Sequence, residues 1–213
     1  MIESIDEIIA RAPYLDRHYM SKKSKAKTIT ALGSSRSTKE LEQAMKASSD
    51  ITRHFVEHGY NILTGCGTNG IMGAVYDAAA KYSEIVDGKP VQNLVIVKKP
   101  LWGDENIRDC VIIGKASSEE ARVRKFMRTS NTFIAFPGGA TTIEEAATLI
   151  QNNKYPKNGE TKTVILFGKD FWAGLIEQYK KLFETKILKE NPIGKLFHIA
   201  DSPEEVIRLI IKK

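Results

Sequence analysis

Residues 132–145 read TFIAFPGGATTIEE, and this stretch contains a strand, a glycine turn and the start of a helix in direct succession. The run 132–136 is mostly apolar, which is typical of a strand buried on both faces of a parallel sheet. The same order recurs upstream, where 28–32 precedes Gly33 and 60–64 precedes a glycine cluster at 65–70. Strands that alternate with long helices predict βαβ units. The predicted fold class is therefore α/β, a single doubly wound parallel sheet with helices on both faces.

Hydrophobic periodicity places the other elements. Further strands are predicted at 91–97, 109–113, 163–167 and 196–199, and helices at 39–58, 71–82, 118–128, from Thr142 onward, 171–183 and 203–211. Ahead of the first strand, residues 2–10 have isoleucines at helical spacing, and the basic stretch 22–27 is interpreted as a solvated linker. Two parts are therefore expected, an N-terminal helical arm with its linker at 1–27 and one α/β domain at 28–213.

Composition excludes several classes of protein. The chain has 213 residues, a net charge of +6 and only two cysteines, Cys66 and Cys110, which excludes a disulfide scaffold and a cysteine-rich zinc module. Its apolar runs fall far short of the roughly 20 residues that cross a bilayer, and its N-terminus is acidic where a signal peptide is basic. We expect a cytoplasmic protein without a membrane partner. The small positive charge suits an anionic ligand, and nucleic acid is not an expected partner.

Three predicted strand ends have residues that suit a phosphate. They are Gly33, Ser34 and Ser35 after the first strand, the cluster 65–70 after the second, and 137–142 after the strand 132–136. Ligands of doubly wound sheets bind outside the carboxyl ends of the strands. Small residues at such turns expose backbone N–H groups at the positive end of a helix. Together the three turns favour a nucleotide or sugar-phosphate site.

The cluster at 65–70 also matches the dinucleotide fingerprint G-x-G-x-x-G, through Gly65, Gly67 and Gly70. Two features weaken a hydride-transfer function. The cluster follows the second strand, and the next strand runs into Lys98 with no acidic residue to hold a ribose hydroxyl. Lys98 leaves a 2′-phosphate cofactor open, and glycines that only permit a tight turn are a further alternative. The favoured interpretation is a mononucleotide phosphate cradle.

His54 and His58 belong to a segment that spells the inverted zinc-protease pattern H-x-x-E-H. Gly59 ends that predicted helix at once, and neither His18 nor His198 lies in a motif that indicates a third ligand. Histidines in the last turn of a helix also suit the negative end of its dipole. We therefore expect no metal site.

The helix predicted at 118–128 has two arginines beside its apolar seam. Ser117 and Glu120 have the spacing of a capping box at its start, and Arg122 and Arg124 flank the seam. An arginine in that position can reach into a cleft and bind a phosphate or a ribose. Periodicity does not choose between the two arginines, and a solvated helix face explains either one.

The helix predicted from Thr142 has two carboxylates near its start. Thr141 or Thr142 can be the N-cap, and Glu144 or Glu145 then closes a capping box. Alternatively, a carboxylate lies beside the phosphate cradle. The helix dipole favours its ionised form there, and an ionised carboxylate suits stabilisation of, or attack on, an oxocarbenium-like sugar better than proton donation.

The pair Arg124-Lys125, followed after a strand by PGGATTIEE at 137–145, is similar to the R-K and P-G-G-x-G-T-x-x-E motifs of the Lonely Guy family. The likeness extends upstream to GSS at 33–35 and TGCGTNGIMG at 64–73. It implies a Rossmann-like domain, usually a homodimer, that hydrolyses the N-glycosidic bond of a purine nucleoside 5′-monophosphate without metal or cofactor. Such proteins have long been labelled lysine decarboxylases, but no lysine here lies in a context that indicates Schiff-base chemistry.

Carried over by motif, the resemblance makes Arg124 and Glu145 the catalytic pair. The other candidate site residues surround the phosphate, line the cleft or lie beside them in the same motifs: Gly33, Ser34, Ser35, Gly65, Gly67, Gly70, Arg122, Lys125, Gly138, Gly139, Thr141, Thr142 and Glu144. The expected reaction converts an AMP-like nucleoside 5′-monophosphate into free base and ribose 5-phosphate.

Three positions depart from the family pattern. Thr141 stands at a family glycine, and a β-branched residue there is strained by very roughly 1–3 kcal/mol if the position has a positive φ. Cys66 replaces the middle glycine of the upstream motif, and Ala121 replaces a methionine ahead of the R-K pair. These departures leave an alternative function open, a non-catalytic nucleotide or cofactor carrier that resembles molybdenum-cofactor carrier proteins.

Overall fold

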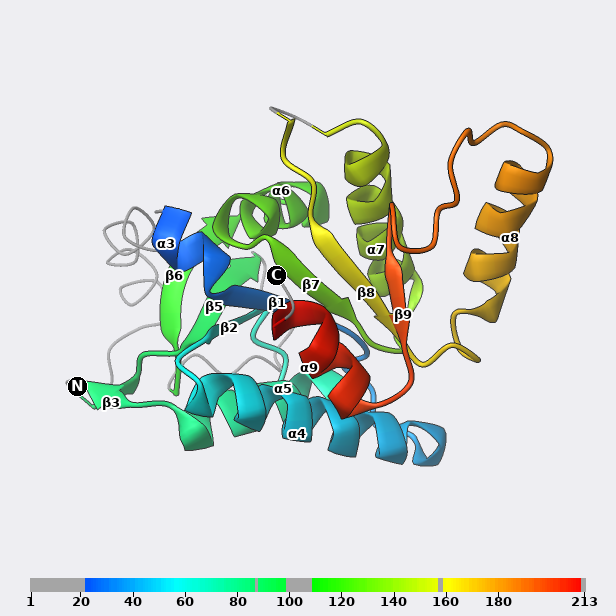
Figure 1. Ribbon diagram of the computed structural model, residues 1–213. Coiled ribbons are helices and arrows are strands. Elements are labelled where there is room, and N and C mark those ends of the chain that lie inside the picture. Colours follow the sequence, from blue (N-terminus) through cyan, green and yellow to red (C-terminus); the bar gives the residue numbers. More distant parts are fainter. Residues whose placement is uncertain (1–21, 87, 99–108, 157–158, 212–213) are drawn as a thin grey trace.

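The structure is a computed structural model that describes residues 22–86, 88–98, 109–156 and 159–211 (Figure 1). At its centre is a seven-stranded sheet with the order β6-β5-β2-β1-β7-β8-β9, in which every neighbouring pair is parallel. The strands are β1 (Thr28–Leu32), β2 (Asn61–Thr64), β5 (Asn93–Lys98), β6 (Val111–Ala116), β7 (Thr132–Ala135), β8 (Thr163–Phe167) and β9 (His198–Ala200). The predicted α/β class and doubly wound parallel sheet are confirmed.

Helices cover both faces of this sheet (Figure 1). Successive strand residues point to opposite faces, so in β8 Val164 and Leu166 enter one core, whereas Ile165 and Phe167 enter the other. The first core is closed by α6 (Glu119–Thr129), α7 (Ala140–Lys154) and α8 (Ala173–Glu184), and the second by α4 (Glu42–Glu57), α5 (Gly70–Tyr82) and α9 (Pro203–Ile211). A third, smaller apolar cluster includes Tyr76 of α5, Val95 and Val97 of β5 and Ile112 of β6, so the sheet is packed against helices on both faces.

The sequence did not predict several short elements. These are α3 (Lys22–Ala26) and an antiparallel hairpin of β3 (Ile85–Val86) and β4 (Lys89–Pro90), while the helix predicted at 39–58 starts with a 3₁₀ turn, η2 (Lys39–Leu41). α3 lies in the stretch interpreted as a linker, and Lys25 makes a 2.6 Å ion pair with Glu160 that ties it to the domain. The helix predicted at 2–10 lies outside the described residues.

Side-chain contacts, one local and one with a distant residue, accompany two shifts in predicted helix starts. The N-cap predicted at Ser117 is wrong, because Ser118 is the N-cap of α6 and its Oγ accepts a 3.2 Å hydrogen bond from the N–H of Ala121. The helix predicted from 171 begins at Ala173. Trp172 precedes it and is buried, and its indole N–H donates to the carbonyl of Ala135.

Strand order reverses between β1 and β7. The chain runs from β1 through β2 and β5 to β6 at one edge, and then returns to β7 on the other side of β1. Leu32 and Ala135 are register partners, so the carboxyl ends of β1 and β7 lie side by side. Because ligands of such sheets bind where strand order reverses, a site is expected at the carboxyl ends of these two strands.

In the described part of the chain, no helix has the length and apolar character needed to cross a membrane.

Candidate functional site

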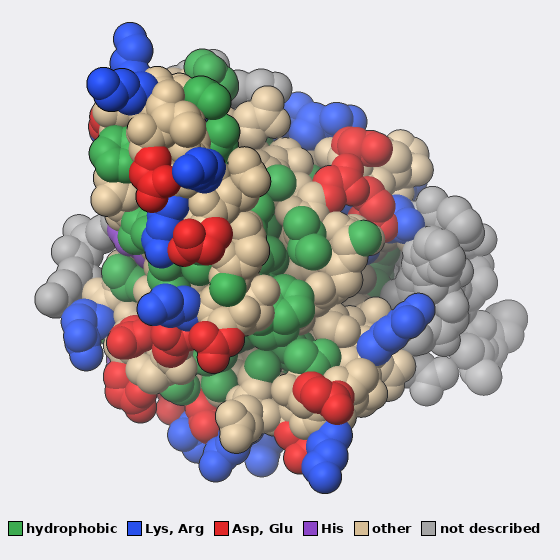
Figure 2. Space-filling view, turned by 90° about the vertical axis from the view of Figure 1, so that its right-hand side faces the viewer, with side chains coloured by type: hydrophobic (Ala, Val, Ile, Leu, Met, Phe, Trp, Pro, Cys, Tyr) green, Lys and Arg blue, Asp and Glu red, His purple; other side chains and the backbone are tan. Residues whose placement is uncertain are grey.

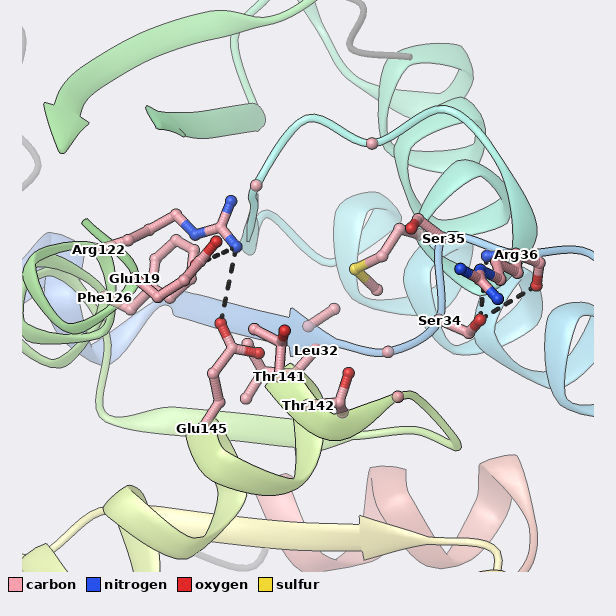
Figure 3. A pocket seen from close by; sticks show the side chains of 16 residues that line it. Leu32, Ser34, Ser35, Arg36, Glu119, Arg122, Phe126, Thr141, Thr142 and Glu145 are labelled. Atoms are coloured by element: carbon pink, nitrogen blue, oxygen red, sulfur yellow. Dashed lines mark hydrogen bonds and ion pairs between the residues drawn. The ribbon is translucent and has the colours of Figure 1, made fainter. Parts of the chain in front are cut away.

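A cavity of about 450 Å³ opens at the reversal point between β1 and β7 (Figure 3). The turns after β1, β2 and β7 line it, together with one side of α6. Its lining residues are Ala31, Leu32, Gly33, Ser34, Ser35, Arg36, Gly65, Gly67, Met72, Glu119, Arg122, Phe126, Gly139, Thr141, Thr142 and Glu145. On the molecular face toward which β7 and β8 point in Figure 1, acidic and basic side chains are interspersed (Figure 2).

One end of the cavity combines the turn after β1 with the start of α7. The N–H of Ser34 donates to the carbonyl of Pro137 at 3.0 Å, which ties the two turns together. Within the first turn, Ser34 Oγ accepts a 3.0 Å hydrogen bond from the N–H of Arg36. Gly139 is the N-cap of α7, and no side chain caps that helix. The first N–H groups of α7 therefore face the cavity from the positive end of a helix, which suits an anion.

Two glycines are required by the geometry of this end. Gly70 has a φ of +59°, and a Cβ there would lie 2.5 Å from the carbonyl oxygen of Arg36 and 2.7 Å from that of Ser34. A Cβ on Gly138 would collide with the side chain of Thr142. Neither glycine lines the cavity. Each allows the close packing of residues that do line it.

At the other end, Arg122 of α6 extends between two carboxylates (Figure 3). Its Nη2 lies 2.6 Å from Glu119 Oε2 and 3.9 Å from Glu145 Oε1. The guanidinium carbon lies 5.9 Å from the centre of the Phe126 ring. A Cβ on Gly65 would lie 2.8 Å from Arg122 Nη1, so the glycine makes room for the arginine. The buried Nε of Arg122 has no acceptor among the described residues.

Glu145 is the buried carboxyl group of the cavity, with 7% of its side chain exposed. Burial raises its pKa from the usual value near 4.5 to about 7, while Arg122 acts in the opposite direction and Glu119 and Glu144 raise the pKa further. Burial therefore opposes the ionised form that the helix dipole was expected to favour. α7 begins at Ala140, which puts Glu145 in the second turn, where loss of solvation outweighs the dipole. The capping boxes predicted from Thr141 and Thr142 are also wrong, because Gly139 is the N-cap and both threonines lie inside α7.

The structure separates the two arginines that periodicity left equivalent. Arg122 lies beside Glu145, whereas Arg124 is exposed and lines a second cavity of about 390 Å³ between α6 and α7. Glu144 also lines that second cavity, and Glu145 borders both. Lys125 lines neither; its side chain lies beside Gly114 of β6. The arginine that the R-K motif placed next to Glu145 is therefore two positions away from the one found there.

Backbone strain lies at Cys66 and not at Thr141. Thr141 belongs to α7, and the positive-φ residues of the described chain do not include it. The strain considered for Thr141 is therefore absent. Cys66 has a φ of +66° and is fully buried. It occupies a left-handed position that a glycine adopts at lower cost.

Other sequence-based candidates have different partners. His54 and His58 stack on each other with ring centres 4.2 Å apart, and His58 Nδ1 lies 2.6 Å from the carbonyl oxygen of His54. The described residues include no group of three or more potential ligands that could hold a metal ion. Lys98, which the sequence left open as a partner for a 2′-phosphate, makes a 2.6 Å ion pair with Glu119.

The candidate list omitted six residues that line the cavity, namely Ala31, Leu32, Arg36, Met72, Glu119 and Phe126. A signal existed for Glu119, because it stands three positions before Arg122, at the spacing of a helical ion pair. Arg36 directly follows the predicted GSS turn. Met72 belongs to the motif quoted at 64–73, whereas nothing in the sequence distinguished Phe126 from an ordinary core residue.

Comparisons with known proteins identify the family of this chain. The family described as "Possible lysine decarboxylase" matches residues 72–210, well over half of the chain. A probable cytokinin riboside 5′-monophosphate phosphoribohydrolase, LOGL3 of Oryza sativa subsp. japonica, is 30% identical over 125 residues, which are 58% of this chain and 55% of that protein. The chain thus spans about half the length of this curated relative.

Two solved structures are similar in fold. The molybdenum cofactor binding protein of Rippkaea orientalis is 20% identical with a TM-score of 0.57, and the match covers 87% of this chain and 94% of that one. The Moco carrier protein of Chlamydomonas reinhardtii is 16% identical with a TM-score of 0.54, over 87% and 98% of the two chains. Both support the Rossmann-like sheet. The family match and the motifs around the cavity show that the chain belongs to the possible lysine decarboxylase family, also called the Lonely Guy family.

Proposed function

We propose that the protein hydrolyses the N-glycosidic bond of a nucleoside 5′-monophosphate, giving free base and ribose 5-phosphate. The observation that carries the proposal is the buried carboxyl of Glu145, which lies next to Arg122 in a cavity whose other end is built to receive an anion. Membership of the family and the phosphoribohydrolase relative support the same reaction class.

The phosphate anchors the substrate in this mechanism. Its oxygens accept hydrogen bonds from the uncapped start of α7 after Gly139 and from the serines of the β1 turn, with the cation of Arg36 nearby. Arg122, which lines the cavity, binds the ribose through its guanidinium N–H groups. Binding energy gained at the phosphate then orients the reacting bond, as remote contacts do in many enzymes.

Glu145 acts at C1′ of the ribose. As the bond from C1′ to the base nitrogen breaks, the electron pair leaves with the base and positive charge develops on the sugar. The ionised carboxylate stabilises that charge. Water supplies the oxygen that bonds to C1′, and one of its protons ends on the base. A carboxyl group whose pKa is about 7 can accept and return that proton near neutral pH.

The test is direct. AMP, GMP, CMP and an N6-substituted AMP are incubated with the protein, and free base is measured by chromatography. We expect base release from at least one purine nucleotide, loss of release in Glu145→Gln, and normal release in Glu177→Gln, which changes a carboxyl on α8 outside both cavities. AMP binding should persist in Glu145→Gln, and an unchanged rate in that variant would remove Glu145 from the mechanism.

The same assay distinguishes a carrier from an enzyme. A protein that binds nucleotides without releasing base from any of the four substrates would be a carrier, the alternative function of this fold. The assembly is a separate question. The resemblance implies a homodimer, and light scattering on the purified protein measures its mass directly.

A further inference from the structure

We propose that Glu119, itself held by Lys98, is a positioning residue that keeps the guanidinium of Arg122 on its own carboxylate and away from Glu145. The kinetic consequence rests on the proposed function, whereas the electrostatic consequence does not. The residues come from three neighbouring elements: Lys98 from the end of β5, Glu119 and Arg122 from α6, and Glu145 from α7.

Glu119 makes close ion pairs with two cations. Glu119 Oε1 lies 2.6 Å from Lys98 Nζ, and Glu119 Oε2 lies 2.6 Å from Arg122 Nη2. The same Nη2 remains 3.9 Å from Glu145 Oε1, beyond hydrogen-bonding distance. Arg122 is thus shared unequally between two carboxylates, and the closer one is fixed in place by a second cation.

The two cations of this cluster are largely buried. The side chains of Lys98 and Arg122 are only 12% and 17% exposed, so water and salt screen this cluster less than an ordinary surface ion pair. The Phe126 ring lies near the guanidinium, and Gly65 leaves room for it. These apolar and backbone neighbours define a slot, and Glu119 decides where in the slot the positive charge lies.

The effect on Glu145 follows from Coulomb's law. The charged groups that act on its carboxyl are Arg122 and Glu119 from α6 and Glu144 from its own helix, and Arg36 lines the same cavity from the β1 turn. Glu119 raises the pKa of Glu145 in two ways, through its own negative charge and by holding Arg122 at a distance. Lys98 restrains both effects, because it neutralises Glu119 and occupies one of its oxygens.

Two substitutions therefore move Glu145 in opposite directions. Glu119→Gln keeps the shape of the side chain but removes its charge and releases Arg122 toward Glu145, which lowers the pKa of Glu145 by about one unit. Lys98→Met removes one positive charge from the cluster and frees both oxygens of Glu119 to bind Arg122, which raises that pKa. A purely structural role gives no reason for opposite signs.

The control is Glu177→Gln. Glu177 and Lys180 form an ion pair of the same 2.6 Å length and the same three-residue spacing on α8 as Glu119 and Arg122 do on α6. This pair lies outside both cavities. Its loss matches the loss of a helical ion pair without touching the cluster, and we expect neither the titration nor the activity to change.

The measurement is the titration of the Glu145 side chain by carbon NMR, with the signal assigned by its disappearance in Glu145→Gln. We expect a lower midpoint in Glu119→Gln and a higher one in Lys98→Met, and the acidic limb of kcat/KM against pH should move with each. An unchanged midpoint in Glu119→Gln, or a shift of the same sign in both variants, would overturn the inference. If Glu119→Gln does not fold, the direction of the Lys98→Met shift decides.

These experiments distinguish failure of the proposed function from failure of the inference about Glu119. A wild-type protein that releases no base from any nucleotide refutes the hydrolase, yet the two titration shifts still support or overturn the positioning role. If base is released and neither titration nor pH profile responds to the substitutions, the hydrolase stands and the role of Glu119 is refuted.

Discussion

Replacement of Glu145 by glutamine should make the protein more stable at alkaline pH and leave its stability unchanged at acidic pH. Burial raises the pKa of this carboxyl from 4.5 to about 7. Below pH 4.5 the group is protonated in the folded and the unfolded chain alike, so it contributes no difference. Between these two values only the unfolded chain releases the proton, and the free energy of unfolding falls as pH rises. Above pH 7 the full cost of a buried charge is present.

The size of the effect follows from the two pKa values. At about 1.4 kcal/mol per pH unit, the interval from 4.5 to 7 corresponds to roughly 3 kcal/mol. Local relaxation reduces this figure, and we expect Glu145→Gln to gain about 1–3 kcal/mol at pH 8. Arg122 keeps its 2.6 Å partner Glu119 in the variant, so no arginine is left unpaired. In a chain of this length, 1 kcal/mol raises the melting temperature by roughly 2–4 °C.

Thermal unfolding of wild type and variant at pH 4 and at pH 8 measures the effect. The control is Glu177→Gln, which removes an exposed carboxyl of α8 that lines neither cavity. We expect the stabilisation at pH 8 only in Glu145→Gln. A difference between wild type and Glu145→Gln that is equal at the two pH values, or a lower melting temperature of the variant at pH 8, would refute the reasoning.

Three further predictions concern activity, backbone geometry and buried hydrogen bonds. Arg122→Lys should reduce kcat/KM for AMP at least tenfold, about 1.4 kcal/mol, and more than Arg124→Lys does, because only Arg122 lies beside the buried carboxyl; equal losses would contradict this, and steady-state base release measures it. Gly70→Ala should lower the free energy of unfolding by about 2 kcal/mol or more, since its φ of +59° and two carbonyl oxygens exclude a Cβ, whereas Gly174→Ala on open α8 should raise it by about 0.5–1 kcal/mol in urea titrations. Asn153→Ala should cost about 2–4 kcal/mol in the same titrations, because its buried amide serves two backbone carbonyls and one backbone N–H; a loss below 1 kcal/mol would mean that water replaces the amide.

The alternation of strands and helices could be predicted because it depends on local pattern. The run 163–167 has a bounded apolar sequence, and the predicted strand matches β8 residue for residue. The helix at 203–211 likewise matches α9. Elements whose ends depend on distant contacts were less accurate. The helix predicted from 171 starts later, since the indole N–H of Trp172 donates a hydrogen bond to the carbonyl of Ala135 on β7.

The turns of the site could also be predicted, but not the chemistry between them. Gly33, Ser34 and Ser35 follow a strand in the sequence and line the cavity in the structure. The arginine is a different case. Arg122 and Arg124 flank the same seam, and the difference between them depends on where α7 lies against α6, which no local pattern contains.

By itself, the sequence of this protein determined the α/β class, the succession of strands and helices along the chain and the three glycine- and serine-rich turns, because each depends on residues near one another in the chain. Tertiary structure alone decided the charges of the site. The carboxyl of Glu145 has a raised pKa because strands and helices from both halves of the chain exclude water from it. Its arginine is Arg122 because α6 brings that side chain to 3.9 Å from Glu145 and Gly65 leaves room for the guanidinium. Burial and Coulomb interactions act through space, between groups that the sequence keeps far apart.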